Sequence, residues 1–269
     1  MSDTQPRGFC CDADRSLISC DGLHAEADLE AWRGGRLYAW TRELIEVVRA
    51  EGVEGATLLD IGAGVGAVHL SLLAAGAARA IDVDGSREYL AAARAEAEGR
   101  GLARRVEYRY GDAVELAASL PPADVVTLDS VVCCYAHVDR LLDAATTSRP
   151  RLVGITYPRD VWWMRAYMRL YNLTHALRRP RDRYFIHRHA LVNRLMTDAG
   201  YRNVHEGGTR RWRVVLYRRK SVAPGALPAD PSRSVGQGPH RVLHAAAGLN
   251  SSAPNHRNHN ICDIDGSQG

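Results

Sequence analysis

Three aspartates stand at the ends of short apolar runs in the first half of the sequence, and a glycine-rich turn follows the first of them. The run that ends at Asp60-Ile61 leads into Gly62-Ala-Gly-Val-Gly66. Because glycine adopts positive φ angles and carries no Cβ, such a turn lets a ligand approach the backbone closely. Asp82 lies about 20 residues further on, where a carboxylate can accept both hydroxyl hydrogens of a ribose and would repel a 2′-phosphate. Asp112 follows a third run, where it can accept a hydrogen bond from an exocyclic amine.

Taken alone, the glycine turn fits two classes of ligand. Gly62, Gly64 and Ala67 satisfy G-x-G-x-x-G/A, the pattern that binds the diphosphate of a dinucleotide. Against a diphosphate, Asp60 stands two residues before the first glycine, and the glycines also fit the tighter spacing 62, 64 and 66. Asp112 adds a further negative charge. Acids at three strand ends favour a ligand with a cationic or amine-bearing head, a ribose and an adenine.

Short apolar runs alternate with stretches of helical periodicity, which predicts a parallel sheet covered by helices on both faces. Ligands in such sheets bind at the carboxyl ends of the strands. We expect strands at Thr57–Ile61, Ala78–Asp82, Val106–Tyr110, Asp124–Leu128 and Leu152–Thr156. We expect helices at Ala27–Ala50, Val65–Ala75, Ser86–Glu98, Ala113–Ser119 and His137–Thr147.

The pattern changes after the fifth of these runs. A long helical stretch rich in Trp, Tyr and Met covers Val161–Leu177, and another helix is expected at His189–Ala199. Two strand-like runs, Tyr201–Glu206 and Arg211–Arg219, are separated by Gly207-Gly208, which indicates an antiparallel hairpin. The predicted fold class is therefore α/β, a doubly wound and mostly parallel sheet that ends in an antiparallel hairpin.

With these motifs in order, the sequence resembles the class I S-adenosylmethionine-dependent methyltransferases over roughly residues 30–219. Leu59–Gly66 is similar to the first motif of that family, Asp82 to its ribose-binding acid, Gly111-Asp112-Ala113 to its adenine-binding motif, and Asp124–Val131 to the motif on its fourth strand. The resemblance implies a Rossmann-like, seven-stranded sheet and S-adenosyl-L-methionine as the cofactor. It implies that the cofactor is bound by Asp60, Gly62, Ala63, Gly64, Gly66, Asp82, Val83, Asp112, Ala113 and Asp129.

Within that family, the sequence most resembles bacterial proteins near the magnesium-protoporphyrin methyltransferases. The similarity lies in the N-terminal helix, in Cys133-Cys-Tyr135, and in Ile155-Thr-Tyr-Pro158 before Trp162-Trp163. A carboxylate-bearing macrocycle would suit residues 149–220, which carry 18 Lys or Arg and only 4 Asp or Glu. The same excess of arginine is also typical of ordinary solvated positions, so both interpretations stay open.

Methyl transfer is an in-line displacement at a sulfonium carbon, so an enzyme contributes mainly by aligning the acceptor and excluding water. No dedicated catalytic residue is required. Tyr135 and His137, after the fourth predicted strand, are the candidates for taking a proton from an acceptor hydroxyl or amine. Alternatively, Tyr135 packs as a wall and His137 begins the next helix. Tyr157 either lines the same cleft or belongs to the core.

Composition narrows the class of protein. The chain has 269 residues, of which 46% are hydrophobic and 25% charged, with a net charge of +4, so it is neither wholly disordered, collagenous nor coiled-coil. No apolar run reaches the roughly 18 residues of a spanning helix, and the first residues lack the apolar core of a secretory signal. Six cysteines, four of them in two adjacent pairs, do not indicate a disulfide framework. We therefore expect a soluble, cytoplasmic protein.

Three regions are predicted along the chain. Residues 1–50 form a lead-in and a lid helix, residues 51–220 form the cofactor-binding domain, and residues 221–269, rich in Pro, Gly, Ser, Asn and His, form a disordered tail. No metal site is expected, because the His- and Cys-containing segment 255–262 lacks a second fixed pair of ligands. If the lid brought the cysteine pairs together, they could bind a soft centre; otherwise they are small buried side chains. The cysteines concerned are Cys10, Cys11, Cys20, Cys133 and Cys134.

The predicted function is methyl transfer from S-adenosyl-L-methionine to a small anionic or planar molecule, with oxygen favoured as the acceptor atom. An RNA methyltransferase would instead use the basic segment as its electrostatic footprint. The sequence after the fourth strand reads Asp129-Ser-Val-Val and lacks an Asn/Asp-Pro-Pro-aromatic motif, so nucleic acid is not the expected partner. Two further functions are consistent with the glycine turn, namely a non-catalytic partner subunit that binds the donor and a nicotinamide dehydrogenase. The sequence makes no prediction of the oligomeric state.

Overall fold

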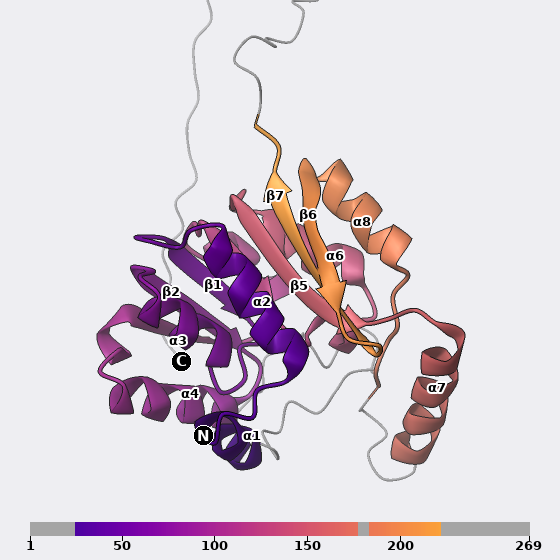
Figure 1. Cartoon of the computed structure of the whole chain (residues 1–269), viewed down its shortest axis with the longest axis horizontal. Coiled ribbons are helices and arrows are strands. Elements are labelled where there is room, and N and C mark those ends of the chain that lie inside the picture. The colour runs from indigo at the N-terminus through magenta and orange to yellow at the C-terminus, as the bar shows by residue number, and fades with distance from the viewer. Residues whose placement is uncertain (1–24, 177–182, 222–269) are drawn as a thin grey trace, which may run out of the picture. The chain divides into compact units, whose positions relative to one another are not determined.

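The computed structural model describes residues 25–176 and 183–221, whose strands form one sheet (Figure 1). The strand order is β3-β2-β1-β4-β5-β7-β6. Strands β1 to β5 run parallel, and β7 runs antiparallel to both β5 and β6. The predicted α/β class, mostly parallel with an antiparallel hairpin at the end, is confirmed. The strands are β1 (Thr57–Ile61), β2 (Arg79–Asp84), β3 (Val106–Tyr110), β4 (Val125–Leu128), β5 (Leu152–Pro158), β6 (Tyr201–Gly208) and β7 (Trp212–Arg219).

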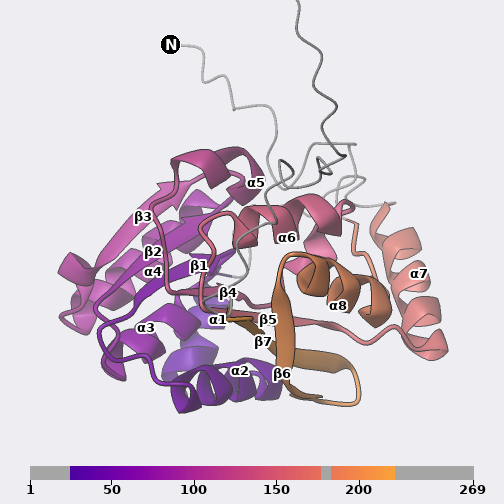
Figure 2. The ribbon, with the colours of Figure 1, turned by 90° about the horizontal axis from the view of Figure 1, so that it is seen from above.

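Helices cover both faces of this sheet. Figure 2 shows α2 and α3 along one face and α5, α6 and α8 along the other. The helices are α1 (Ala25–Arg33), α2 (Ala39–Ala50), α3 (Ala67–Ala74), α4 (Arg87–Gly99), α5 (Ala113–Leu116), α6 (Val138–Thr146), α7 (Trp162–Ala176) and α8 (His189–Asp198). Short 3-10 turns lie at Ala103–Arg105, Ala117–Ser119 and Val132–Cys134.

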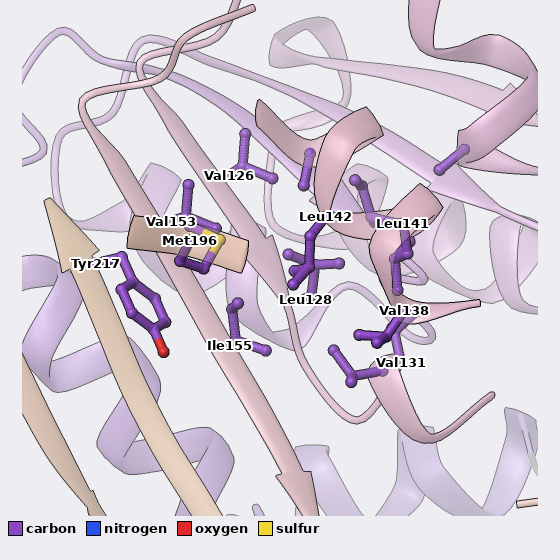
Figure 3. Packing of buried hydrophobic residues seen from close by; sticks show 14 of the residues in the cluster. Val126, Leu128, Val131, Val138, Leu141, Leu142, Val153, Ile155, Met196 and Tyr217 are labelled. Atoms are coloured by element: carbon purple, nitrogen blue, oxygen red, sulfur yellow. The ribbon is translucent and has the colours of Figure 1, made fainter. Parts of the chain in front are cut away.

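The two faces of the sheet bury separate hydrophobic cores because successive strand residues point in opposite directions. Leu59 of β1 belongs to one core. Figure 3 shows Leu141 of α6 and Met196 of α8 in the same core. Leu58 faces the opposite core, where Leu44 of α2 and Leu70 of α3 are fully buried. Asp60 and Asp82, which follow the same alternation, therefore point toward α3 rather than along the sheet edge.

Several expected boundaries are wrong; β5, for example, ends at Pro158 rather than at Thr156. The single helix expected at Ala27–Ala50 is two helices, because the chain turns at Gly34-Gly35, where Gly35 has a φ of +73°. The glycines of the hairpin belong to β6, and the turn lies after Gly208, where Thr209 Oγ1 accepts from the backbone of Trp212. Strand β2 runs two residues beyond Asp82, to Asp84.

None of the helices in the described part of the chain combines the length and the apolar character needed to cross a membrane. The predicted tail, residues 221–269, lies outside the described residues except for its first position.

Candidate functional site

A cavity of about 410 Å³ opens at the carboxyl edge of the sheet. Its lining includes Asp60 and the glycine turn after β1, Asp84 at the end of β2, and Asp129 after β4. Residues of α1, of α2 and of the segment between them line it from the other side. The carboxyl edge is where open α/β sheets bind ligands, and the volume lies within the 300–1,000 Å³ typical of small-molecule sites.

The three glycines of the turn have different surroundings. A Cβ at Gly62, whose φ is +64°, would overlap the Val131 side chain, and a Cβ at Gly66 would lie 2.8 Å from the His69 ring. At Gly64, whose φ is +56°, the only described atoms near such a Cβ belong to the Tyr89 ring, 3.9 Å away. Gly62, Ala63 and Gly64 line the cavity, whereas Gly66 does not. Close packing therefore requires Gly62 and Gly66, and Gly64 leaves open space toward the cavity.

The carboxylate at the cavity end of β2 is Asp84, not Asp82. Asp84 accepts hydrogen bonds from the backbone N–H of Gly64 at 2.9 Å and of Ser86 at 2.8 Å, and it lines the cavity together with Val83. Asp82 pairs in register with Asp60 inside the sheet, is fully buried and does not line the cavity. The placement of Asp82 at the strand end is therefore wrong, because two further residues belong to the strand.

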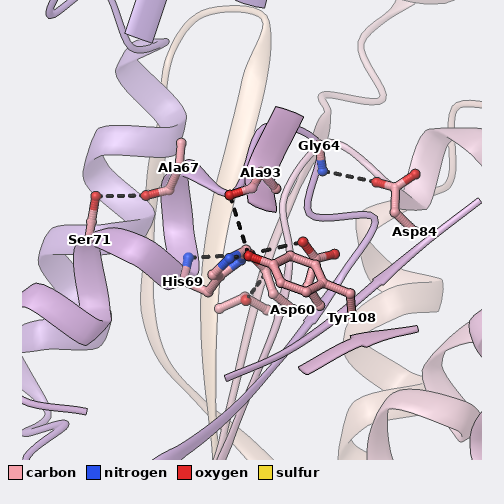
Figure 4. A network of polar contacts seen from close by, with 10 residues as sticks. Asp60, Gly64, Ala67, His69, Ser71, Asp84, Ala93 and Tyr108 are labelled. Carbon is pink, nitrogen blue, oxygen red and sulfur yellow. Dashed lines mark hydrogen bonds and ion pairs between the residues drawn. The ribbon is translucent and has the colours of Figure 1, made fainter. Parts of the chain in front are cut away.

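Asp82 instead lies beside a buried polar pair, Asp60 and His69, which Figure 4 labels. Asp60 accepts from His69 Nδ1 at 3.0 Å and from the Thr127 hydroxyl at 2.6 Å. His69 Nε2 lies 4.0 Å from the Asp82 carboxylate, and within the described residues neither of them has a hydrogen-bond partner there. Burial, with Asp84 and Asp60 nearby, raises the pKa of Asp82 well above its ordinary value. His69 and Thr127 thus fix the Asp60 carboxylate below the cavity.

Asp129, directly after β4, forms a second carboxylate at the cavity and is half-buried. Thr41 of α2 donates to it at 2.6 Å, and Thr156 of β5 also donates to it. Burial raises the pKa of Asp129 to about 6, against the lowering effect of these hydroxyl groups. The adjacent Ser130 has a φ of +63° and accepts from Trp40 Nε1 at 3.2 Å, so α2 is held against the end of β4.

The third predicted acid, Asp112, lies beside the cavity rather than in its lining. It begins α5, where Oδ1 accepts from the backbone of Val114 at 2.9 Å and from the Tyr135 hydroxyl at 2.7 Å. Its neighbours Gly111 and Ala113 do line the cavity. The Tyr135 side chain is a buried wall of the cavity, and its hydroxyl is bonded to Asp112, which follows β3.

Of the remaining candidates within the described residues, only Cys134 reaches the cavity lining. His137 is exposed and begins α6, as one of its two interpretations from the sequence expects. Tyr157 is buried, and its hydroxyl lies 2.6 Å from His189 Nδ1, so it belongs to the core side of β5. Cys133 is buried and Cys134 lines the cavity, with both thiols directed at the carbonyl of Ser130. The described residues contain no group of three or more side chains suited to a metal.

The residues that line the cavity from the N-terminal side were not predicted from the sequence. Arg36 and Tyr38 lie between α1 and α2, and Asp28 of α1 accepts from the Tyr89 hydroxyl of α4 at 2.7 Å. Tyr184, in the segment before α8, closes another side. The pair Gly34-Gly35 is the one signal that points to this arrangement, because a break there turns Arg36 and Tyr38 toward the sheet. Cys10, Cys11, Cys20 and the segment 255–262 lie outside the described residues.

Residues 58–148 match the protein family described as a methyltransferase domain. The fold is similar to that of magnesium protoporphyrin IX methyltransferase from Synechocystis PCC 6803, with 18% identity, a TM-score of 0.56, and 67% of this chain and 82% of that chain covered. The fold is also similar to that of an O-methyltransferase family protein from Burkholderia thailandensis, with 18% identity, a TM-score of 0.58, and 78% of this chain and 66% of that chain covered. A mitomycin 7-O-methyltransferase is similar with 24% identity, a TM-score of 0.51, and 67% of this chain and 54% of that chain covered. No curated protein sequence matches the chain.

Proposed function

We propose that this chain, a class I S-adenosylmethionine-dependent methyltransferase by its domain and its fold, methylates a small planar or anionic acceptor, with oxygen favoured as the acceptor atom. The observation that carries the proposal is one cavity in which a glycine turn meets three carboxylates, those of Asp60, Asp84 and Asp129. The similar Synechocystis structure was determined with S-adenosylhomocysteine bound.

The β2 and β3 side of the cavity fits the adenosyl part of the donor. The open space at Gly64 admits a ligand against the backbone, and Asp84 beside it can accept hydrogen bonds from ribose hydroxyls. Gly111 and Ala113 line the cavity where an adenine would lie. Asp112 is already an acceptor for Tyr135 and Val114, so it supports this wall through the Tyr135 ring.

The β1 and β4 side fits the amino acid part of the donor. Asp60 and Asp129 both line the cavity and are close enough that Asp60 raises the pKa of Asp129, so this region of the cavity is suited to a cationic group. Arg36, from the opposite side, is the lining residue that can pair with a carboxylate. We therefore assign the ammonium of the donor to Asp129 and its carboxylate to Arg36.

The bound donor supplies an electrophilic methyl group on a sulfonium, and the chain positions an acceptor against it. Asp60 is held by His69 and Thr127, and Asp129 by Thr41 and Thr156, so neither carboxylate must reorganise when a cation arrives. The segment that contains Arg36 and Tyr38 lines the cavity, where it would shield a bound donor from water.

The acceptor would enter beyond Ser130, where Val131, Cys134 and Tyr184 line the cavity. These apolar and aromatic side chains suit a planar molecule. The excess of arginine in residues 149–220 suits an acidic one. Oxygen is favoured because Asp129-Ser-Val-Val replaces the motif that binds an amide nitrogen.

We further propose that residues 1–50 act as the lid, that residues 51–220 bind the donor, and that the protein acts in the cytoplasm, where its cysteines stay reduced. The contacts of Thr41 with Asp129 and of Asp28 with Tyr89 support the first part of this division.

Two measurements test the proposed function. Calorimetry with S-adenosylhomocysteine should show binding, while NADH should not bind. Incubation with methyl-labelled donor and a panel of phenols, carboxylates and amines should transfer label to small acceptors. Binding of the donor with no transfer across the whole panel would favour the non-catalytic partner subunit, and steeply salt-dependent RNA binding with transfer to RNA would favour the RNA methyltransferase.

A further inference from the structure

Helix α7 exposes an unusual amount of apolar surface. Trp162 is 80% exposed, Leu170 61%, Leu173 65% and Tyr167 54%. Among the described residues these are four of the five exposed large hydrophobic side chains. At 3.6 residues per turn, Trp162, Leu170 and Leu173 fall on one face and Tyr167 lies at its border. We call these four residues the α7 outer face.

The opposite side of α7 anchors the helix to the protein. Met164 is buried, and Asn172 makes two hydrogen bonds with the backbone of Tyr184, at 2.9 and 3.0 Å. The Tyr171 ring meets the Tyr184 ring edge-on, with the centroids 5.3 Å apart. Figures 1 and 2 both show α7 at the margin of the fold, beyond α8. The outer face is therefore directed away from the contacts that hold the helix.

The charge beside the α7 outer face is positive. The helix contains Arg165 and Arg169 and no acidic residue, and both arginines fall along one border of the apolar face. Asp160 pairs with Arg165 at 3.5 Å, whereas Arg169 is exposed. Near the first turn, Arg210 lies over the Trp163 ring at 5.6 Å. The partner of this face must therefore be apolar and, at its border, anionic.

We infer that the α7 outer face docks on the surface of an anionic lipid bilayer. A helix with Trp and Leu on one side and arginine at the border lies in the membrane interface, where the apolar side chains enter the acyl boundary and the guanidinium groups meet lipid phosphates. The helix does not span the bilayer; its 15 residues lie along the surface.

The charges and the aliphatic side chains argue against a second copy of the chain and against RNA as the occupant. Two copies of this face would bring arginine against arginine, since α7 offers no acid to pair with them. A single-stranded RNA would stack on Trp162 and Tyr167, but Leu170 and Leu173 gain nothing from a base. An anionic bilayer offers hydrocarbon to the apolar side chains of the α7 outer face and phosphate groups to the arginines at its border.

Docking there has a consequence for the site that the proposed function describes. Tyr184, which α7 holds through Asn172 and Tyr171, is a wall of the cavity. A membrane on the α7 outer face therefore lies on the far side of α7 from this wall, about one helix diameter, roughly 10 Å, from the acceptor side of the cavity. If the proposed methyl transfer is correct, its acceptor is an amphiphile taken from the membrane interface.

Sedimentation with vesicles tests the inference without any donor or acceptor, so its outcome is separate from that of the proposed function. The full chain should bind vesicles of phosphatidylcholine with phosphatidylglycerol and should bind phosphatidylcholine alone at least tenfold more weakly. The double variant Leu170→Gln/Leu173→Gln should bind the anionic vesicles at least tenfold more weakly than the wild type. Both side chains are exposed, so thermal stability should not change.

Matched variants separate the α7 outer face from general basic charge. Arg169→Gln should weaken vesicle binding severalfold, whereas Arg104→Gln, which removes another exposed guanidinium far from α7, should not. Brominated lipid in anionic vesicles should quench tryptophan fluorescence, and Trp162→Phe should remove most of that quenching. The inference is overturned if anionic vesicles do not bind, if Leu170→Gln/Leu173→Gln binds like the wild type, or if the same variant abolishes self-association or RNA binding instead.

Discussion

The backbone N–H of Gly64 donates a 2.9 Å hydrogen bond to Oδ2 of Asp84, so the carboxylate at the end of β2 is fixed against the glycine turn. The other oxygen of Asp84 accepts from the backbone of Ser86, where α4 begins. Asp84 is thereby oriented before any ligand arrives, and its position at the cavity lining makes it the residue expected to bind the ribose.

We expect Asp84→Asn to weaken the binding of S-adenosylhomocysteine by about 1–3 kcal/mol, roughly ten- to a hundredfold. The amide has one acceptor oxygen in place of two, so it cannot accept from Gly64, from Ser86 and from the ribose hydroxyls together. Asp82→Asn is the matched control, because it removes an equal charge from the same strand outside the cavity, and it should change the affinity by less than about 0.5 kcal/mol. Calorimetric titration of both variants with S-adenosylhomocysteine tests this prediction. Equal losses of affinity in the two variants would contradict the assignment of the ribose to Asp84.

The sequence alone does not show whether Asp82 or Asp84 lies at the cavity end of β2. Asp82 and Asp84 lie 20 residues after Gly62 and Gly64 respectively, so spacing alone does not choose between them. The choice depends on where β2 ends, and that depends on Gly85 and on Ser86, whose Oγ accepts from the backbone of Tyr89 to begin α4. The helix start at Ser86 was predicted, but Val83 and Asp84 were not recognised as the last residues of the strand.

Asp82→Asn should stabilise the protein at pH 7.5, by about 1–3 kcal/mol in the free energy of unfolding. The wild-type carboxylate is fully buried, and neither oxygen has a hydrogen-bond partner within the described residues. Because burial raises its pKa, the folded wild type gains stability as the pH falls toward the ordinary aspartate range near 4, so the advantage of the variant should shrink there. Denaturant unfolding from pH 7.5 to 5 measures this.

An exposed acid provides the comparison for that experiment. Glu107→Gln, on the exposed side of β3, should change stability by less than about 0.5 kcal/mol at either pH. If Asp82→Asn is instead less stable than the wild type at pH 7.5, the Asp82 carboxylate contributes stability in the fold, with His69 Nε2, 4.0 Å away, as its nearest partner.

Donor binding should weaken below pH 6. Burial raises the pKa of Asp129 to about 6, so the carboxylate proposed to hold the ammonium of the donor is protonated below that pH and charged above it. The affinity for S-adenosylhomocysteine should be constant above about pH 7 and fall by up to tenfold for each pH unit below 6. Asp129→Asn should bind weakly with little dependence on pH. A wild-type affinity that stays constant down to pH 5 would exclude this role of Asp129.

The N-terminal side of the cavity was predicted only as a lid, without the residues that line it. Each residue there reaches the site through a tertiary contact, as when Thr41 donates to Asp129 or Trp40 to Ser130, about 90 positions away. Such contacts leave no local pattern in the sequence. By contrast, the strands β1 and β3 match their predicted ranges at both ends, because hydrophobic runs and the flanking turns specify them locally.

Arg36→Gln should weaken binding of S-adenosylhomocysteine by about 1–2 kcal/mol, because a charge-assisted hydrogen bond to the carboxylate of the ligand is lost. The same variant should bind 5′-methylthioadenosine, which lacks the amino acid part, as tightly as the wild type does. Arg49→Gln, at the other end of α2, is the matched control and should bind both ligands normally. A loss of affinity for both ligands would show that Arg36 shapes the lid rather than pairing with the carboxylate.

Gly62→Ala and Gly64→Ala should fail in different ways, although both residues have positive φ angles and lie two positions apart. The new methyl group at position 62 would overlap the Val131 side chain, so Gly62→Ala should lower the free energy of unfolding by about 2–4 kcal/mol through overpacking and backbone strain. At position 64 the nearest ring atom lies at an ordinary distance of 3.9 Å, so the variant carries only the strain of about 1–2 kcal/mol.

The effects of the two variants on donor binding should have the opposite order to their effects on stability. Gly64→Ala places its methyl group in the space left for the donor, so it should abolish binding of S-adenosylhomocysteine while the protein stays folded. Val131→Ala should recover part of the stability that Gly62→Ala loses, because it removes the overlapping side chain, and it should recover none of the binding lost in Gly64→Ala. Normal donor affinity in Gly64→Ala would contradict a cofactor lying against this turn.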